Sequence, residues 1–230
     1  ACLMIGTAGQ HGLNSLAEIL AGKIAPSGRL TGTWCYNNFT TPAMWNFTPV
    51  PYENAKAMGV PDNADTYQVY QEGIYVGYKY YETRYDDYVM GTGNAGDYAY
   101  NAEVAFPFGY GLSYTSFEFR GLELSAESIA PGESIVASVT VANTGSRAGT
   151  AVPQLYIRDW VSSTVKPERY LCGFARVDLE PGEEKTVQIT IGPKSMRTLD
   201  QDYVWNVEPG KFTVYLGENA EKVLLEQSFF

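Results

Sequence analysis

Several residue types and segments that mark common functional classes are scarce or missing in this 230-residue chain. It has a single histidine, which excludes a zinc site built from several histidines of this chain. Its three cysteines, Cys2, Cys35 and Cys172, are odd in number and lack the spacing of metal ligands. We therefore expect buried free thiols rather than a disulfide framework or a metal site.

Positive charge is also scarce. The chain carries 16 Lys and Arg residues against 26 Asp and Glu residues, for a formal net charge of -10. Nucleic-acid binding needs a clustered basic face, and the sequence contains no basic stripe, so we expect no nucleic-acid partner. No apolar run approaches the roughly 20 residues that span a bilayer, so we expect no membrane partner.

No signal peptide is recognisable in the sequence, which leaves both a cytoplasmic and a secreted location open. The chain begins with Ala1-Cys-Leu-Met-Ile5 rather than with an initiating methionine. This apolar start is typical of a buried strand, and we expect the chain to be a piece of a longer protein.

What the chain does have is a hydrophobic content of 45% and an aromatic content of 14%, enough for a sizeable core. Its length allows two modest domains, or one domain and part of another. The segment Phe106-Pro-Phe-Gly-Tyr-Gly-Leu-Ser-Tyr-Thr115 separates two regions of different character. The region before it is rich in Tyr, Asn and Gly, and the region after it alternates apolar and polar residues.

The first 30 residues have the pattern of a strand, a turn and a helix. Ala1–Ile5 predicts the end of a buried strand, and Asn14 is a candidate N-cap for a helix that ends near Gly22. Leu30–Trp34 is a second strand candidate. Farther along, the alternation of Gly73–Tyr81 predicts a strand, and the glycines that follow predict a loop over residues 85–100.

From Tyr114 onward, short alternating segments are separated by turn signals, which is typical of an antiparallel β-sandwich. The expected strands are Phe117–Leu124, Ile135–Val141, Ala151–Ile157, Val187–Ile191 and Phe212–Leu216. The turn signals are Pro131-Gly132, Asn143-Thr-Gly145, Pro181-Gly182 and Pro209-Gly210. No cysteine pair occupies an immunoglobulin-like position, which favours the fibronectin type III version.

Several segments, taken in order, resemble one protein family. They are Gly9–Gly22, Pro26-Ser-Gly-Arg-Leu30, Tyr70–Tyr81, Phe106–Thr115, Asn143–Gly149, Gln154–Arg158, Lys166-Pro-Glu-Arg169 and Leu179–Glu183. The family is that of the family 3 glycoside hydrolases, most of which are β-glucosidases. The resemblance covers essentially the whole chain, and the series is far more specific than any one motif.

The resemblance implies an α/β fragment followed by an all-β fibronectin type III-like sandwich. Residues 1–113 would be the C-terminal portion of the family's α/β sandwich domain, and residues 114–230 the fibronectin-like domain. The family's reaction is retaining hydrolysis by a barrel Asp nucleophile and a Glu acid/base, with no cofactor. Neither catalytic residue matches a position in this chain. The implied partners are a TIM-type barrel, in cis or in trans, and a β-linked oligosaccharide or glucoside bound through the parent enzyme.

One subgroup of the family has a permuted domain order, with the barrel after the fibronectin-like domain. Thr31-Gly-Thr-Trp34 and the loop over residues 85–100 look closest to that subgroup. On this hypothesis a barrel follows Phe230 in the parent protein.

The candidate substrate-binding residues lie in the Tyr- and Gly-rich loop. They are Tyr85, Asp86, Asp97, Tyr98 and Tyr100. Tyrosine rings can stack on a sugar while their hydroxyls bond its rim. The alternative is that the rings pack the loop and that the carboxylates cap turns. Similarly, Glu72 is more simply explained by a backbone bond or a pair with Arg84 than by catalysis.

Two other functional classes stay open at this stage. A non-catalytic carbohydrate-binding or adhesion module would also display tyrosines on a sandwich, but it would have no need for the α/β-like N-terminal segment. A split hydrolase would place the barrel on a separate chain, and co-purification with such a chain would identify it.

Overall fold

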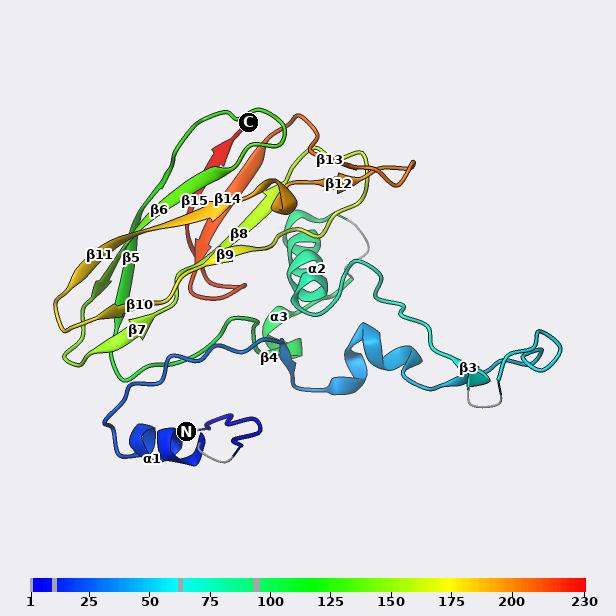
Figure 1. Ribbon diagram of the computed structural model, residues 1–230, viewed down its shortest axis with the longest axis horizontal. Coiled ribbons are helices and arrows are strands. Elements are labelled where there is room, and N and C mark those ends of the chain that lie inside the picture. The colour runs from blue at the N-terminus through cyan, green and yellow to red at the C-terminus, as the bar shows by residue number, and fades with distance from the viewer. Residues whose placement is uncertain (1, 10–11, 62–63, 93–95) are drawn as a thin grey trace. The chain divides into compact units, whose positions relative to one another are not determined.

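The computed structural model describes residues 2–9, 12–61, 64–92 and 96–230, which form two compact units (Figure 1). One unit comprises Ala1–Thr31, Phe108–Val165 and Arg169–Phe230, and the other comprises Gly32–Pro107 and Lys166–Glu168. The domain boundary expected at residues 113–114 stays a prediction. Among the described residues, no helix has the length and apolar character needed to cross a membrane.

The larger unit is a β-sandwich of the expected kind. Its two main sheets have the strand orders β11-β6-β5 and β15-β14-β8-β9, and all pairings are antiparallel. The strands of the first sheet are β5 (Phe117–Leu124), β6 (Ile135–Asn143) and β11 (Glu184–Ile191). Those of the second sheet are β8 (Gln154–Asp159), β9 (Tyr170–Phe174), β14 (Phe212–Gly217) and β15 (Val223–Phe229).

Two smaller pairs complete the sandwich. They join β7 (Gly149–Ala151) to β10 (Val177–Leu179) and β12 (Thr198–Leu199) to β13 (Trp205–Asn206), and the short helix η4 (Pro193–Ser195) precedes β12. The core between the main sheets is aliphatic at its centre. Ile135, Val139, Leu155, Val214 and Leu216 are fully buried there because alternate residues of each strand point inward.

Two of the expected turns repeat the same design. Pro131-Gly132 and Pro181-Gly182 each place the glycine at a positive φ, of 91° and 77° respectively. A backbone hydrogen bond closes each turn, from Glu133 to Ala130 and from Glu183 to Glu180, both at 3.0 Å. Proline followed by a left-handed glycine is the signature of a type II turn, so both turn predictions are confirmed.

Asn143 explains the Asn-Thr-Gly signal at the end of β6. Its side chain is buried, and Nδ2 donates to the carbonyl oxygens of Arg147 at 2.7 Å and Leu179 at 3.1 Å. Oδ1 accepts from Thr115 Oγ1 at 2.7 Å and from the Gly145 amide at 3.1 Å. All four hydrogen-bonding positions of the amide are therefore used to tie this corner together.

The N-terminal segment differs from its prediction in two respects. Residues 2–5 are exposed and form no strand, because a strand needs a paired neighbour and the described residues provide none. Helix α1 (Gly12–Leu20) begins before Asn14, so Asn14 lies in the first turn and is not the N-cap. The predicted end of the helix is confirmed. Gly22 has a φ of 69°, and the backbone amide of Lys23 donates to the carbonyl oxygen of Glu18 at 2.8 Å, as in a Schellman motif.

The Phe106–Thr115 segment holds residues 27–30 against the sandwich. Leu30 and the segment exchange two backbone hydrogen bonds, from Leu30 to Tyr110 at 2.9 Å and from Gly109 to Leu30 at 2.8 Å. On the other side, Gln154 Nε2 donates to the Gly109 carbonyl at 3.0 Å. A Cβ at Gly111 would overlap the carbonyl oxygen of Gly28, so this close backbone approach requires glycine.

The smaller unit has little regular structure. Its elements are β1 (Trp34–Cys35), η1 (Asn38–Thr40), η2 (Pro42–Asn46), β2 (Val50–Pro51), β3 (Thr66–Tyr67), α2 (Tyr78–Met90), α3 (Tyr100–Glu103) and β4 (Val104–Phe106). The predicted strand Gly73–Tyr81 is wrong, because residues 73–77 contain no strand and α2 begins at Tyr78. The loop predicted over residues 85–100 is wrong for residues 85–90, which lie in α2. Gly77, the N-cap of this helix, has a φ of 61° and a ψ of -131°, a conformation that favours glycine.

The three cysteines are free, as expected, but they are less buried than expected. Cys2 is exposed, and Cys35 and Cys172 are half-buried. Burial nevertheless raises the pKa of Cys172 to about 12, so this side chain is a neutral thiol at physiological pH.

Candidate functional site

The predicted site residues lie in or next to a cluster of tyrosines in the smaller unit. Tyr81 and Tyr85 are four residues apart on α2 and therefore share one face of the helix. Tyr98 lies just before α3, and Tyr100 is the first residue of α3. The Tyr85 and Tyr100 ring centroids are 5.2 Å apart, and those of Tyr98 and Tyr100 are 6.4 Å apart, both in edge-to-face geometry.

A buried carboxylate lies within this cluster. Glu82 is 1% exposed, and Tyr100 Oη donates to its Oε1 at 2.6 Å. A carboxylate removed from water is stable only when hydrogen bonds or charges compensate for its lost hydration. The short bond from Tyr100 is part of that compensation, and it joins α2 to the segment around residue 100.

Arg84 brings a positive charge to the same cluster. Its Nη1 donates to Tyr80 Oη at 2.6 Å, and its guanidinium carbon lies 4.7 Å from the centroid of the Tyr98 ring. This distance is within the range of a cation–π interaction. The pairing of Arg84 with Glu72, expected from the sequence, stays a prediction.

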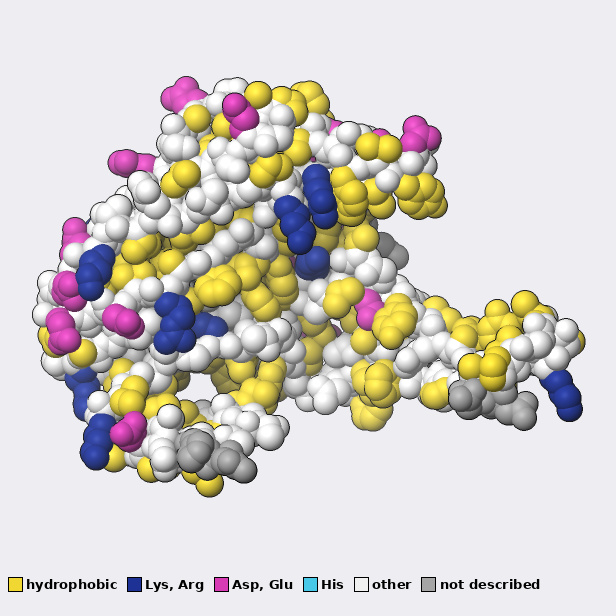
Figure 2. Space-filling model, in the orientation of Figure 1, with side chains coloured by type: hydrophobic (Ala, Val, Ile, Leu, Met, Phe, Trp, Pro, Cys, Tyr) yellow, Lys and Arg dark blue, Asp and Glu magenta, His cyan; other side chains and the backbone are white. Residues whose placement is uncertain are grey.

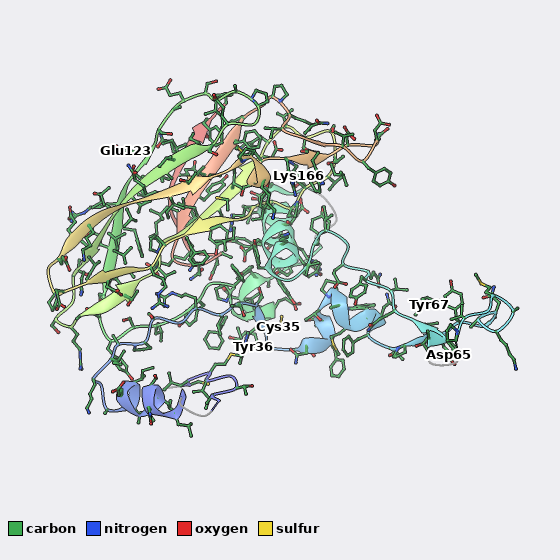
Figure 3. All side chains as sticks on the ribbon, in the orientation of Figure 1. Cys35, Tyr36, Asp65, Tyr67, Glu123 and Lys166 are labelled. Atoms are coloured by element: carbon green, nitrogen blue, oxygen red, sulfur yellow. The ribbon has the colours of Figure 1, made fainter. Side chains whose placement is uncertain are left out.

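Burial sets the protonation of the neighbouring hydroxyl and thiol groups. It raises the pKa of Tyr81 and the pKa of Tyr98, and the negative charges of Glu82 and Glu103 raise the pKa of Tyr98 further. Burial also raises the pKa of Cys35 (Figure 3), whose Sγ donates to Tyr81 Oη at 2.7 Å. These groups are therefore protonated at neutral pH and are not nucleophilic anions.

Comparison with protein families identifies both parts of the chain. Residues 1–78 match the model of the glycosyl hydrolase family 3 C-terminal domain, and residues 151–220 match that of the fibronectin type III-like domain. Thermostable beta-glucosidase B of Acetivibrio thermocellus is 34% identical over 215 residues, which cover 93% of this chain and 24% of that protein. The chain belongs to glycoside hydrolase family 3.

Other members of family 3 agree with this assignment. A beta-glucosidase of Kluyveromyces marxianus is 34% identical over 94% of this chain and 22% of its own length. The solved structure of beta-glucosidase 3B from Thermotoga neapolitana in complex with alpha-D-glucose superposes with a TM-score of 0.74 at 32% identity, over 96% of this chain and 26% of that chain. The chain thus spans about a quarter of the length of the family 3 relatives that it matches.

Within the family 3 fragment, the five candidate residues fall into two groups. Tyr98 and Tyr100 are 3% and 5% exposed, so their rings pack inside the cluster. Tyr85 is 40% exposed, Asp86 is half-buried and Asp97 is exposed. The structure brings the three tyrosine rings together, and the role of the five residues in substrate binding stays a prediction.

The sequence reasoning missed Glu82 as a member of the cluster. The spacing of Tyr81, Tyr85 and Tyr88 is that of one face of a helix and could have indicated α2. The alternation in Gly73–Tyr81 instead favoured a strand. A helical reading would have placed Glu82 next to Tyr81, on the side of α2 that packs.

Two tryptophans of the larger unit, Trp160 and Trp205, belong to segments of the sandwich. Their side chains are 42% and 53% exposed, respectively. The guanidinium carbon of Arg158 lies 3.8 Å from the centroid of the Trp160 ring, and that of Arg197 lies 4.1 Å from the centroid of the Trp205 ring. They are therefore at the edge of the sandwich rather than in its core.

The single histidine, His11, lies outside the described residues. Over the part of the chain that is described, no three His, Cys, Asp or Glu side chains gather as metal ligands would.

Proposed function

We propose that this chain is the non-catalytic C-terminal part of a retaining β-glucosidase that removes terminal β-linked sugars. The observation that carries the proposal is the match of 93% of the chain, at 34% identity, to an enzyme named as a β-glucosidase. The solved family 3 structure in complex with alpha-D-glucose supports glucose as the sugar. The parent enzyme would need no metal or organic cofactor.

Retaining hydrolysis needs two carboxyl groups about 5 to 5.5 Å apart, one as nucleophile and one as acid/base. In the family these come from the barrel and from a part of the α/β domain that this chain does not match. The most enclosed carboxylate described here, Glu82, is bonded to Tyr100 inside the protein. We therefore propose that both catalytic carboxylates lie outside this chain, on a barrel and an α/β segment supplied in cis or in trans.

We further propose that the accessible members of the candidate set form part of the wall of the substrate cleft in the parent enzyme. Tyr85 offers an exposed ring, and Asp86 and Asp97 offer carboxylates that accept hydrogen bonds from sugar hydroxyls. Tyr98 and Tyr100 support this wall from behind, since Tyr100 packs against Tyr85 at 5.2 Å. Each such contact contributes to substrate affinity rather than to the chemical step.

The test is to express the complete reading frame and to assay it on 4-nitrophenyl β-D-glucoside, following the anomeric configuration of the product by NMR. We expect glucose released with retained configuration, and no turnover by residues 1–230 alone. Turnover by residues 1–230, or inversion by the complete enzyme, would contradict the proposal.

Substitutions in the complete enzyme test the cleft wall. We expect Tyr85→Ala and Asp97→Asn each to raise KM about tenfold, the effect of losing about 1.4 kcal/mol of binding, with little change in kcat. Tyr203→Ala, at an 84% exposed tyrosine of the sandwich, is the matched control and leaves KM unchanged. Unchanged KM in both test variants would remove Tyr85 and Asp97 from the substrate site.

A further inference from the structure

The smaller unit contains a long segment, residues 36–77, that has almost no core of its own. We call it the arm. Of its described residues only Ala55 is buried, at 5% exposure. The elements described in the arm are short, namely η1, η2 and the two-residue strands β2 and β3. An isolated two-stranded pair is marginally stable at best, so these elements do not hold the arm in place by themselves.

The side chains that the arm exposes are those that normally fill an interface. The arm has eight aromatic residues and five charged residues, although charged residues outnumber aromatic ones in the chain as a whole. Phe39, Trp45 and Tyr70 are 77%, 73% and 77% exposed, and Met58 is 62% exposed. Figure 2 shows hydrophobic side chains gathered over the segment around β3 with few charges among them. Enrichment in aromatic residues and Met with depletion of charge is typical of the centre of an interface.

Few side-chain contacts join the described residues of the arm to one another. Tyr67, which Figure 3 labels, makes one edge-to-face contact at 5.3 Å with Tyr52, and Asn46 Nδ2 donates to Gln71 Oε1. These contacts link residues that are distant in the sequence of the arm, and Tyr52 and Tyr67 stay 41% and 44% exposed. Fixing such a segment costs backbone entropy at every residue, and burial of its exposed rings is the available source of compensation.

The family comparison indicates what buries them. The whole arm lies within residues 1–78, which match the family 3 C-terminal domain, whereas the fibronectin-like match begins at residue 151. The relatives continue for about three quarters of their length beyond the part that this chain matches. The arm is thus part of a domain whose other segments are not among these 230 residues.

We infer that the aromatic face of the arm is the docking surface for the rest of the family 3 hydrolase, namely the remaining α/β domain and the barrel. The inference rests on the proposed function, since it takes the partner to be the remainder of that enzyme. Phe39 and Trp45 are its central contacts, because they are large, highly exposed and adjacent on η1 and η2. Trp45 is thereby assigned to packing.

Hydrogen exchange followed by mass spectrometry tests this on residues 1–230 and on the protein made from the complete reading frame. In residues 1–230 we expect the arm amides to exchange at close to the unfolded rate, while β6 and β14 stay protected. In the complete protein we expect arm exchange to be slower by about a hundredfold or more, because opening then requires breaking the docked surface. Equal exchange of the arm in the two proteins would overturn the inference.

Variants of the complete protein sharpen the test. We expect Trp45→Ala to speed exchange in the arm about tenfold while leaving the sandwich peptides unchanged. Phe174→Ala, at a 60% exposed ring on β9, is the control and leaves arm exchange unchanged. Phe39→Ala provides a second, independent variant with the same expectation as Trp45→Ala.

Other occupants are excluded or found by the same measurement. Protection of the arm in residues 1–230 that grows with protein concentration would show that a second copy covers it and would overturn the inference. Protection induced by cellobiose would show a sugar site and would also overturn it. A complete protein that protects the arm but does not hydrolyse β-glucosides would refute the proposed activity and leave the docking surface standing.

Discussion

The sandwich and the tyrosine cluster are stabilised in different ways by the same chain. In the sandwich, Ile135, Leu155 and Leu216 are fully buried between two sheets and contribute through the area that they remove from water. In the cluster, Tyr98 and Tyr100 are almost as buried, but each carries a hydroxyl that has to be accommodated. An apolar core tolerates any neighbour of suitable shape, whereas a tyrosine core depends on specific partners.

This difference predicts how each region responds to substitution. Full burial of an aliphatic side chain contributes about 1.5 to 3 kcal/mol, and the cavity left by its removal adds to the loss. A net hydrogen bond contributes about 0.5 to 1.5 kcal/mol, or about 1.5 to 3 kcal/mol when one partner is charged. We therefore expect the largest effects in the sandwich core, smaller ones in the cluster and the smallest at exposed turns.

The largest effect is expected for Leu155→Ala. Leu155 is fully buried on β8, opposite Leu216 on β14 and Gly173 on β9. A cavity at this position should cost about 3 to 4 kcal/mol of unfolding free energy, measured by urea denaturation. A loss below about 1 kcal/mol would show that the sandwich collapses around the cavity and that its core is not tightly packed.

The joint between residues 27–30 and the sandwich should respond to Gly109→Ala by about 2 to 4 kcal/mol. Gly109 has a φ of 82°, and a Cβ there would overlap the Gln154 side chain and break its bond to the Gly109 carbonyl. Gly132→Ala is the matched control, since its φ is 91° but a Cβ would have no atom within 4 Å. The control should lose only the left-handed strain of about 1 to 2 kcal/mol. Equal losses in the two variants would mean that the overlap is relieved without cost.

The tyrosine cluster offers a matched pair of its own. Tyr100→Phe removes the donor to the buried Glu82, and we expect it to cost about 1.5 to 3 kcal/mol. Tyr98 is equally buried, but its hydroxyl finds no hydrogen-bond partner among the described residues. Tyr98→Phe should therefore be neutral or stabilising by up to about 1 kcal/mol. Comparable destabilisation by both variants, in thermal or urea unfolding, would show that ring packing rather than the Glu82 bond holds the cluster.

The same contrast explains what could be foreseen from the sequence. The strand Phe117–Leu124 was predicted with the bounds of β5, because one side of a sandwich strand faces the core and the period of two is visible. Ala151–Ile157 was predicted as one strand but forms parts of β7 and β8, with Pro153 between them. Proline has no amide hydrogen to continue the ladder, so the break has a local cause that the alternation did not reveal.

Other elements were missed because their order depends on contacts distant in sequence. The first three residues of β15, Val223 to Leu225, are all apolar and do not alternate with polar residues. This strand is formed by pairing with β14. Tyr98 and Tyr100 read equally well as an exposed sugar platform or as packing. Their burial depends on Glu82 and Arg84, more than ten residues away on α2. The sequence contained all the residues of the cluster, but no hydrophobic periodicity indicated that Tyr98 and Tyr100 would contact α2.

The smallest effect is expected at an exposed turn of the sandwich. The bond from Lys185, with help from the Glu180 amide, holds the pKa of Glu183 below its ordinary value. A carboxyl with a lowered pKa stabilises the fold above the ordinary glutamate pKa, and that contribution is lost as the pH falls through the lowered value. Glu183→Gln should therefore lower Tm slightly at pH 7, and the difference from the unchanged protein should vanish on acidification to about pH 3. Glu133→Gln is the comparison variant. Glu133 accepts a hydrogen bond from the Ala130 amide in the Pro131-Gly132 turn, which is the counterpart of the bond from the Glu180 amide to Glu183. A Tm difference for Glu183→Gln that persists at pH 3 would assign the effect to the shape of the turn rather than to the charge.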